Sequence, residues 1–307
     1  MPIHRGRQSR ACANNRTLGL TLSEKLILNY FLVLPLPWQV WALQTQNNQT
    51  IPWSNLLATM IFDGVDSVDH KHMPDCPLPV ESAAIIRERL NEIPHFKTAG
   101  ELTAALEAPA APAQEMLRWI CGKFGHDIVP ATGSLKIPGV PASVHQFIVA
   151  KHVPESQAHF DVRMTRSNFQ SSLFFHGTEM RFLLPILRQG LKVSPAGLLW
   201  MADEPEVSYG YALGAFSDPQ WTNHLKRCGV LLACEAAGIK AAPVVSTTIA
   251  RAVIVRYILL IQENPDLDPN ILALWDRKDP APKRALIEED MVAAFKKIQA
   301  GDIGSGS

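Results

Sequence analysis

The sequence lacks an excess of charge of either sign. Its 29 Lys and Arg residues equal its 29 Asp and Glu residues, so the formal net charge of the 307-residue chain is zero. Proteins that bind duplex DNA through its phosphates usually carry a basic surplus. Direct duplex DNA binding is therefore not expected. The composition, 47% hydrophobic and 19% charged, predicts a globular chain with one substantial core and a smaller unit.

Cysteines are few, and their spacing does not pair them. The five cysteines are scattered along the chain and form no C-x-x-C pair, which argues against a zinc site and against a disulfide framework. An intracellular location, cytoplasmic or nuclear, fits this pattern best. Asp69, His70, His72 and Asp75 are metal-ligand types close together. A solvated loop is the better interpretation of this cluster, and no metal cofactor is expected.

Short motifs of several enzyme classes are also absent. The sequence contains no G-x-S-x-G, no G-x-x-x-x-G-K-[ST], no H-E-x-x-H and no G-x-G-x-x-G. These absences remove the sequence grounds for an α/β-hydrolase, a P-loop nucleotide site, a zinc metalloprotease and a Rossmann dinucleotide site. A function must therefore be sought in less regular patterns.

One long hydrophobic run, residues 26–43, follows a stretch rich in Arg and Lys. This arrangement is typical of a membrane anchor. Pro35 and Pro37 interrupt the run, and each would cost a spanning helix about 3 kcal/mol. A buried structural segment is the favoured interpretation. Membrane anchoring by residues 26–43 is the less favoured alternative.

The patterning divides the chain into four regions. Residues 1–79 have no clear period and no assigned function, and residues 80–130 form a small helical accessory region. Residues 131–263 are rich in strands, and residues 264–307 are a charged helical extension with a flexible tail. The accessory helices are expected at residues 80–93, from about 98 to the Ala/Pro tract at 108–112, and at 113–123.

The strand-rich region contains short apolar runs of strand length. Strands are expected at residues 145–150, 173–176, 229–235 and 252–261, and a helix at 180–189 is expected to end at Gly190. The last two runs are continuously aliphatic, which is typical of central strands buried on both faces. A sheet should therefore dominate this half of the chain.

Three short pieces of the strand-rich region carry candidate chemistry. Residues 174–178 (FFHGT) precede a helix exit, residues 197–203 (GLLWMAD) precede Ser208 and Tyr211, and a strand pair covers 231–235 and 253–261. A histidine at the end of a buried strand can present its imidazole to a ligand hydroxyl, and a following glycine lets the backbone approach that ligand closely. Each piece alone is more typical of structural residues. The order and spacing of the three carry the hypothesis.

In this order the pieces resemble the catalytic domain of the poly(ADP-ribose) polymerase superfamily. That family has a strand ending in His-Gly-Ser/Thr, an I-L-x-x-G-L helix exit, a G-I-Y-F/L-A-D segment and an L-L-x-x-E-V strand. Ser208 and Tyr211 fall five and eight positions after Asp203, as in the family. The upstream segments 117–120 (LRWI) and 145–147 (HQF) resemble its mono-ADP-ribosylating branch. The resemblance spans about residues 116–261.

The resemblance implies an α+β ADP-ribosyltransferase fold, with two packed, mostly antiparallel sheets, flanking helices and the small helical accessory region. It also implies NAD+ as co-substrate. The Gly177 backbone and the Ser208 hydroxyl would hold the nicotinamide carboxamide, and the Tyr211 ring would stack on the nicotinamide, with Tyr209 as the alternative ring. His176 would bind a ribose hydroxyl of the adenosine half.

Two of the family's three signature positions differ here. His176 is kept, but Trp200 stands where the family has tyrosine, and the catalytic glutamate is expected near Val244 although no Asp or Glu occurs in residues 236–262. His176, Trp200 and Val244 are thus the three catalytic positions. The missing carboxylate implies transfer of a single ADP-ribose to a protein acceptor, with release of nicotinamide. The alternative is a catalytically inactive protein that binds NAD+ or ADP-ribose, or an interaction scaffold.

Overall fold

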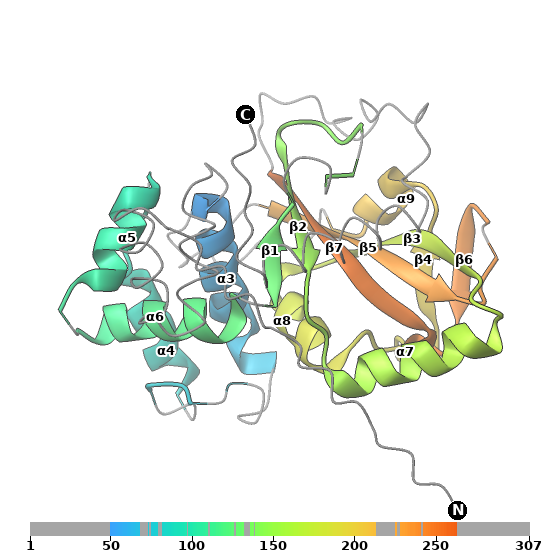
Figure 1. The fold of residues 1–307 in the computed structure, drawn as a ribbon, viewed down its shortest axis with the longest axis horizontal. Helices are drawn as coiled ribbons and strands as arrows, with labels where there is room; N and C mark the ends of the chain where they lie inside the picture. Colours follow the sequence, from blue (N-terminus) through green and yellow to red (C-terminus); the bar gives the residue numbers. More distant parts are fainter. Residues whose placement is uncertain are drawn as a thin grey trace, which may run out of the picture.

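The computed structural model describes residues 50–262, except 68–72, 74, 79–81, 97, 110, 126, 132–135, 138, 213–224, 226–227 and 241. The helices of residues 50–124 gather at one side of the molecule, and the sheet with the later helices forms the other (Figure 1). The hydrophobic run at residues 26–43 and the predicted C-terminal helical extension lie outside the described residues. Within the described part, none of the helices has the length and apolarity that crossing a membrane requires.

One antiparallel sheet organises the strand-rich half. Its strands, in chain order, are β1 (Ile128–Pro130), β2 (Val144–Val149), β3 (Ser171–Thr178), β4 (Leu199–Ala202), β5 (Cys228–Ala237), β6 (Val244–Thr247) and β7 (Val253–Gln262). They form a seven-stranded sheet in the order β1-β2-β7-β5-β3-β4-β6. This confirms a mixed helix and sheet fold. The two packed sheets that were expected are instead one continuous sheet, because the pair Phe175↔Ala202 joins β4 to β3.

The central strands β5 and β7 are covered on both faces. All ten residues of β5 are buried, as the continuous aliphatic run predicted. On one face Val230 and Leu232 pack in the largest core cluster with helices α3 (Thr50–Gly64) and α8 (Met180–Gln189). On the other face Leu231 and Ala233 pack in a second cluster. Successive side chains of a strand point to opposite faces, so each strand contributes to both clusters.

The three accessory helices lie close to their predicted positions. They are α4 (Ala83–Asn91), α5 (Ala99–Glu107) and α6 (Pro112–Phe124). Ser82 and Thr98 cap the first two, because each side-chain oxygen accepts a hydrogen bond from a backbone N–H of the first turn. Arg118, in the LRWI segment of α6, donates to the carbonyl oxygen of Leu106 at 2.8 Å and so binds the end of α5.

Helix α3 has no counterpart in the sequence prediction. Its side chains from Trp53 onward are buried on all sides, against α8 and α6. A helix buried all round has apolar residues on every side and therefore shows no amphipathic period. The Trp53 indole donates to the Ile128 carbonyl oxygen at 2.8 Å, which ties α3 to β1. The boundary expected at residue 79 between the N-terminal region and the accessory helices therefore falls within a single hydrophobic core, which contains residues from both sides of it.

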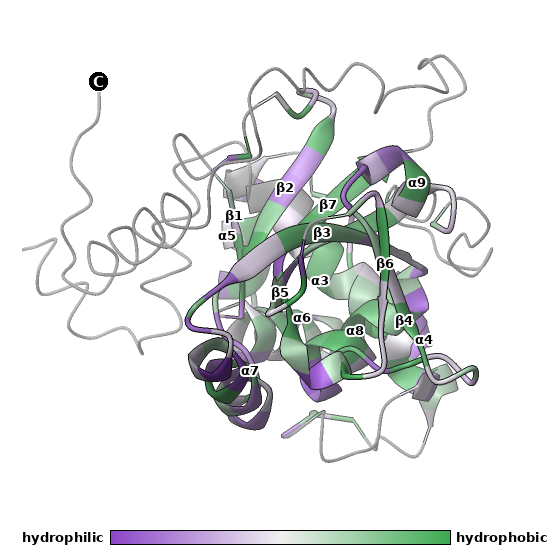
Figure 2. Cartoon of the chain, turned by 90° about the vertical axis from the view of Figure 1, so that its right-hand side faces the viewer, coloured by the Kyte–Doolittle hydropathy of each residue, from purple (hydrophilic) through white to green (hydrophobic). Residues whose placement is uncertain are grey.

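Two further helices flank the sheet. Helix α7 (Pro154–Arg166) presents hydrophilic residues outward, and the strands beside it are mainly hydrophobic (Figure 2). Helix α9 (Pro205–Tyr209) packs on β3, β4 and β5. Helix α8 ends at Gly190 as predicted, with φ 81, a left-handed value that favours glycine.

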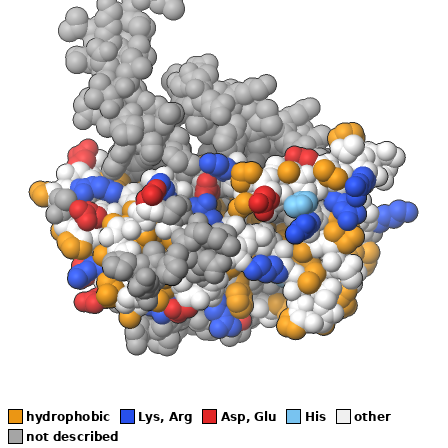
Figure 3. Space-filling model, turned by 90° about the horizontal axis from the view of Figure 1, so that it is seen from below, with side chains coloured by type: hydrophobic (Ala, Val, Ile, Leu, Met, Phe, Trp, Pro, Cys, Tyr) orange, Lys and Arg blue, Asp and Glu red, His pale blue; other side chains and the backbone are white. Residues whose placement is uncertain are grey.

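The surface reflects the balanced composition. Seen from below, blue Lys and Arg side chains, red Asp and Glu side chains and orange hydrophobic side chains are interspersed over the described part of this face (Figure 3). Interspersed charges of both signs do not sum to a strong field of one sign.

Candidate functional site

The strands β3 and β4 separate at one end. Strand β3 pairs with β5 along its whole length, from Ser171 to Thr178, but its register with β4 has the single pair Phe175↔Ala202. Strand β4 pairs along its length with β6 instead. Beyond Phe175, the last residues of β3 are therefore not paired with β4. We call this place the β3–β4 fork and define it by His176, Gly177 and Trp200.

The His176 ring bridges the fork. Its Nδ1 atom lies 2.9 Å from the Trp200 carbonyl oxygen. A carbonyl oxygen only accepts, so Nδ1 carries the hydrogen and the neutral ring keeps a lone pair on Nε2. Burial lowers the pKa of His176 below its ordinary value, although the bond to Trp200 acts in the opposite direction. At neutral pH Nε2 can therefore accept a hydrogen bond from a ligand hydroxyl.

Most of the other predicted site residues lie on one face of the sheet. Paired residues of neighbouring strands point to the same face, and so do residues two apart in a strand. Phe175 and Gly177 of β3 therefore share a face with Trp200 of β4 and Val244 of β6. Helix α9 lies on this face, because its Tyr209 packs in one cluster with Phe175. We call it the α9 face. By the same rule His176, which pairs with Leu232, lies on the opposite face with the cluster of α3 and α8, and its ring reaches the Trp200 carbonyl oxygen from there.

Gly177 and Ser208 are brought into close contact. A Cβ on Gly177 would lie 1.8 Å from the Ser208 carbonyl oxygen and 3.3 Å from the Ala212 backbone nitrogen. Only glycine lets α9 cross the end of β3 at this distance. The buried Ser208 hydroxyl donates to the Phe175 carbonyl oxygen at 2.7 Å and holds α9 in this position. Its lone pairs remain as acceptors.

The two tyrosines of this segment have different environments. Tyr209 is 8% exposed, and a Cβ on Gly229 would lie 2.6 Å from its ring, so this ring packs on β5. Tyr211 is 77% exposed, and its backbone N–H donates to the Ser208 carbonyl oxygen at 3.2 Å. Tyr211 is thus the ring that a ligand can reach, and Tyr209 is a core residue.

Trp200 and Val244 lie side by side on the α9 face. The register pairs Trp200 with Ser246 and Ala202 with Val244, which makes Trp200 and Val244 diagonal neighbours. Their side chains are 53% and 51% exposed. Neither β4 nor β6 contains a carboxylate. The three expected catalytic positions, His176, Trp200 and Val244, therefore lie at or beside the fork. Val244 is apolar, and the Trp200 indole offers only a hydrogen-bond donor.

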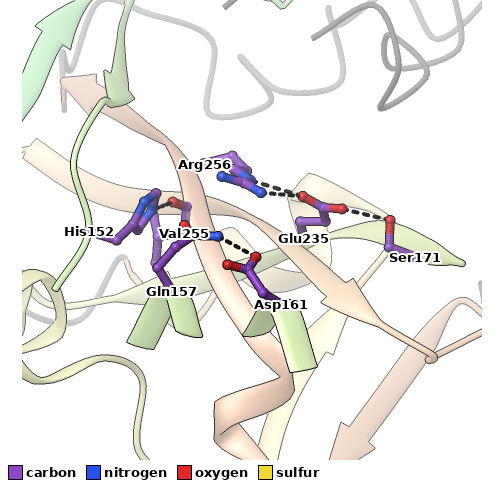
Figure 4. A network of polar contacts seen from close by, with 7 residues as sticks. All are labelled: His152, Gln157, Asp161, Ser171, Glu235, Val255 and Arg256. Atoms are coloured by element: carbon purple, nitrogen blue, oxygen red, sulfur yellow. Dashed lines mark hydrogen bonds and ion pairs between the residues drawn. The ribbon is translucent and has the colours of Figure 1, made fainter. Parts of the chain in front are cut away.

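Glu235 is a buried carboxylate of the same sheet, but it is engaged elsewhere. It pairs in register with Leu173, near the start of β3, whereas the fork lies near the end of that strand. Its Oε1 accepts from the Ser171 hydroxyl at 2.7 Å, and its Oε2 accepts from Arg256 at 2.9 and 2.8 Å (Figure 4). Glu235 therefore does not replace the missing glutamate.

His152 belongs to the same polar region beside α7. Its Nε2 lies 2.6 Å from the Val255 carbonyl oxygen, so Nε2 donates (Figure 4). Burial lowers the pKa of His152 to about 4, and Arg256 contributes to the lowering, whereas the bond to Val255 and the charge of Glu235 oppose it. A neutral His152 thus ties the segment before α7 to β7 and is a structural group.

The thiols of Cys121, Cys228 and Cys234 and the metal-ligand residue types near Asp75 offer no further centre. Burial raises the pKa of Cys121 and Cys228 to about 12 and that of Cys234 further, so these thiols are protonated at neutral pH and are poor nucleophiles. Asp69, His70 and His72 lie outside the described residues, and Asp75 forms an ion pair with Lys123. No cluster of three metal-ligand side chains occurs in the part of the chain that the structure describes.

No protein-family model matches the chain, and no curated protein is significantly similar to it.

Proposed function

We propose that the chain binds NAD+ at the β3–β4 fork and transfers a single ADP-ribose to a protein acceptor, releasing nicotinamide. The observation that carries the proposal is the contact of Gly177 with Ser208 beside the His176–Trp200 hydrogen bond. These two contacts bring His176, Gly177 and Ser208 close to the end of β3. The poly(ADP-ribose) polymerase resemblance assigns these residues to NAD+ binding.

Gly177 and His176 of the fork, and Ser208 and Tyr211 beside it, each have a role in this proposal. The Gly177 backbone and the lone pairs of the Ser208 hydroxyl hold the nicotinamide carboxamide, which offers both a donor and an acceptor. The exposed Tyr211 ring stacks on the nicotinamide. The Nε2 atom of His176 accepts from a ribose hydroxyl of the adenosine half, because its Nδ1 is held by Trp200.

The proposed reaction exchanges one bond at the ribose C1′ atom. The bond between C1′ and the nicotinamide nitrogen breaks, and its electron pair leaves with neutral nicotinamide. The acceptor nucleophile forms the new bond to C1′, and any proton that it carries passes to solvent. Positive charge spreads over the ribose ring during the step, and the positioning of NAD+ supplies much of the rate.

The absence of a carboxylate on β4 and β6 restricts the acceptor. A neutral ribose hydroxyl needs a base to become a nucleophile, so chain elongation is not expected. An acceptor that is already ionised, such as a carboxylate or a thiolate, needs no such base. We therefore propose an acidic or thiol side chain of a protein as the acceptor.

The second candidate function is NAD+ or ADP-ribose binding without catalysis, as in a pseudoenzyme or a scaffold. Trp200 and Val244 favour it, because an indole has only a donor and valine has no polar group. Both candidates use the same residues at and beside the fork. They differ in whether a covalent product forms.

Labelled NAD+ separates the candidates. The purified full-length chain is incubated with NAD+ labelled in the adenosine half, alone and with a cell extract, and covalent label is measured after denaturation. We expect label in units of one ADP-ribose. Thermal unfolding with NAD+ is measured in parallel, since a ligand of the folded state raises Tm. A raised Tm without label identifies the binder, and the absence of both effects contradicts an NAD+ site.

A further inference from the structure

The α9 face of the β4–β6 pair carries a hydroxyl beside the fork. Ser246 pairs in register with Trp200, so the two side chains lie next to each other on this face. Ser246 is exposed, like Trp200 and Val244. Among the residues that β4 and β6 place on the α9 face, Ser246 is the one with an oxygen in its side chain.

The Ser246 side chain can both donate and accept a hydrogen bond, which the side chains of Trp200 and Val244 cannot. A ribose hydroxyl is both a donor and an acceptor, so its best partner offers both functions. The Trp200 indole offers only an N–H, and Val244 offers neither, whereas a serine hydroxyl donates once and accepts twice. Side chains directly opposite on paired strands have Cβ atoms about 4.5–5.5 Å apart. The Ser246 hydroxyl therefore lies at the indole wall, within reach of a ligand that covers it.

We propose that Ser246 is a positioning residue, whose hydroxyl bonds a ribose hydroxyl on the nicotinamide side of bound NAD+. The inference rests on the proposed NAD+ site and adds a residue to it. His176 of β3 holds the adenosine ribose, and Ser246 of β6 holds the other ribose on the α9 face. Trp200 connects the two, because its carbonyl oxygen accepts from His176 and its register partner is Ser246.

A serine hydroxyl in this position orients the ribose but takes no proton from it. The hydroxyl stays protonated at neutral pH and cannot act as the base that a carboxylate would provide. Ser246 therefore fits transfer of one ADP-ribose to an acceptor that is already ionised. No covalent bond to Ser246 forms in the reaction.

The two following threonines differ from Ser246 and provide a control. Thr247 points to the opposite face of β6, and its hydroxyl oxygen accepts from the Ile249 backbone N–H at 3.0 Å. Thr248 is exposed and lies just beyond the end of the strand. Thr248→Ala thus removes an exposed hydroxyl from the same segment without changing the α9 face of the β4–β6 pair.

Calorimetric titration with three ligands tests the proposal on the full-length chain. Nicotinamide lacks the ribose, nicotinamide riboside adds it, and NAD+ adds the adenosine half. Ser246→Ala should lower the affinity for nicotinamide riboside and NAD+ about three- to tenfold, the loss of one neutral hydrogen bond. Nicotinamide affinity should not change. Ser246→Thr, which keeps the hydroxyl, should bind like the unaltered chain, and so should Thr248→Ala.

The outcomes separate this inference from the proposed function. If Ser246→Ala binds nicotinamide riboside as tightly as the unaltered chain does, Ser246 does not position the ribose, although the NAD+ site stands. An equal loss for nicotinamide would also overturn the role, because the change would then be a general distortion. If the unaltered chain binds none of the three ligands, the NAD+ site itself is wrong. Ser246 is exposed on the terminal strand β6, so we expect the variants to fold, and Tm checks this.

Discussion

Gly177 shows how one residue positions a helix. A Cβ at this residue would overlap the Ser208 carbonyl oxygen at 1.8 Å, whereas a Cβ on Gly122 of α6 would meet nothing within 4 Å. The first glycine is required by the approach of α9 to β3. The second lies in a helix, where it only adds flexibility to the unfolded chain.

These two glycines make a matched pair of substitutions. Gly177→Ala should lower the free energy of unfolding by about 1–3 kcal/mol, because the backbone of α9 must move, and it should also weaken NAD+ binding. Gly122→Ala should raise the free energy of unfolding by about 0.5–1 kcal/mol. Urea denaturation of both variants measures these changes. A Gly177→Ala protein as stable as the unaltered chain would show that the close contact is not needed.

Tyr211 is the residue on which the stacking role depends. An aromatic face contributes about 0.5–1.5 kcal/mol beyond the area that it buries, so Tyr211→Ala should weaken nicotinamide and NAD+ by about tenfold or more. Tyr211→Phe should bind almost normally, because the ring is kept. Val207→Ala is the control, since Val207 is another exposed apolar residue of the α9 segment. Titration calorimetry measures the affinities, and equal values for Tyr211→Ala and the unaltered chain would remove the stacking role.

At the scale of elements, the β4–β6 pair determines which side chains lie beside the fork on the α9 face. Its register places Trp200, Val244 and Ser246 together on the α9 face. The pair joins the rest of the sheet at Phe175↔Ala202. The residue types on these two short strands therefore set what the fork can do to a bound ribose.

Restoring a carboxylate tests this view of the β4–β6 pair. Val244→Glu alone should not produce ADP-ribose chains, because the adjacent Trp200 still lacks the acceptor oxygen of a tyrosine. Trp200→Tyr combined with Val244→Glu is the variant to compare, with Val244→Gln as the uncharged control. Product length on denaturing gels is the measurement. Long chains from the single Val244→Glu protein would contradict the role given to Trp200.

At the scale of the whole molecule, the helical part and the sheet share a core. Helix α3 packs against α8, α6 and α4, and the Trp53 indole is bonded to β1. An ion pair of 2.9 Å between Arg188 of α8 and Asp127 joins the helix to the segment before β1. The site therefore rests on a sheet that the accessory helices help to stabilise.

Two tryptophans with opposite exposure test this shared core. Trp53 is 1% exposed and Trp200 is 53% exposed. Trp53→Ala should lower the free energy of unfolding by about 3–5 kcal/mol, since it leaves a cavity and an unpaired carbonyl. Trp200→Ala should change it by about 0.5 kcal/mol or less. Chemical denaturation followed by circular dichroism compares them. Similar losses for both variants would contradict the central place of α3.

The buried His152 predicts a dependence of stability on pH. Its pKa is about 4 in the folded chain, against an ordinary value of 6.5, so the unfolded chain binds the extra proton between these values. The free energy of unfolding should therefore fall as the pH falls from 6.5 to 4, by up to about 1.4 kcal/mol per pH unit from this group. Above pH 6.5 the contribution is constant.

A substitution isolates this contribution. His152→Gln keeps a donor for the Val255 carbonyl oxygen but cannot titrate, so its loss of stability between pH 7 and pH 4.5 should be smaller than that of the unaltered chain. Urea denaturation at the two pH values measures the difference. Parallel curves for the unaltered chain and His152→Gln would show that His152 does not couple folding to pH.

Several elements of this fold can be predicted from local patterns of residues. The amphipathic spacing of α4 to α6, the aliphatic runs of β5 and β7 and the glycine that ends α8 are properties of short segments. Ser208 and Tyr211, whose spacing after Asp203 is a local pattern, belong to the segment that meets Gly177. These predictions concern residues that are close in the chain, where sequence period and backbone geometry are directly linked.

Which residues share a face of the sheet or a core could not be predicted, because it depends on contacts between segments far apart in the chain. Helix α3 escaped prediction because a helix that is buried all round has no polar side to mark its period. The single sheet, the fork and the neighbours of Ser246 follow from the pairing of strands far apart in the chain. The difference between buried Tyr209 and exposed Tyr211 depends on how α9 lies on β3. Strand register and packing decide such contacts, and one residue of register reverses the face of every side chain.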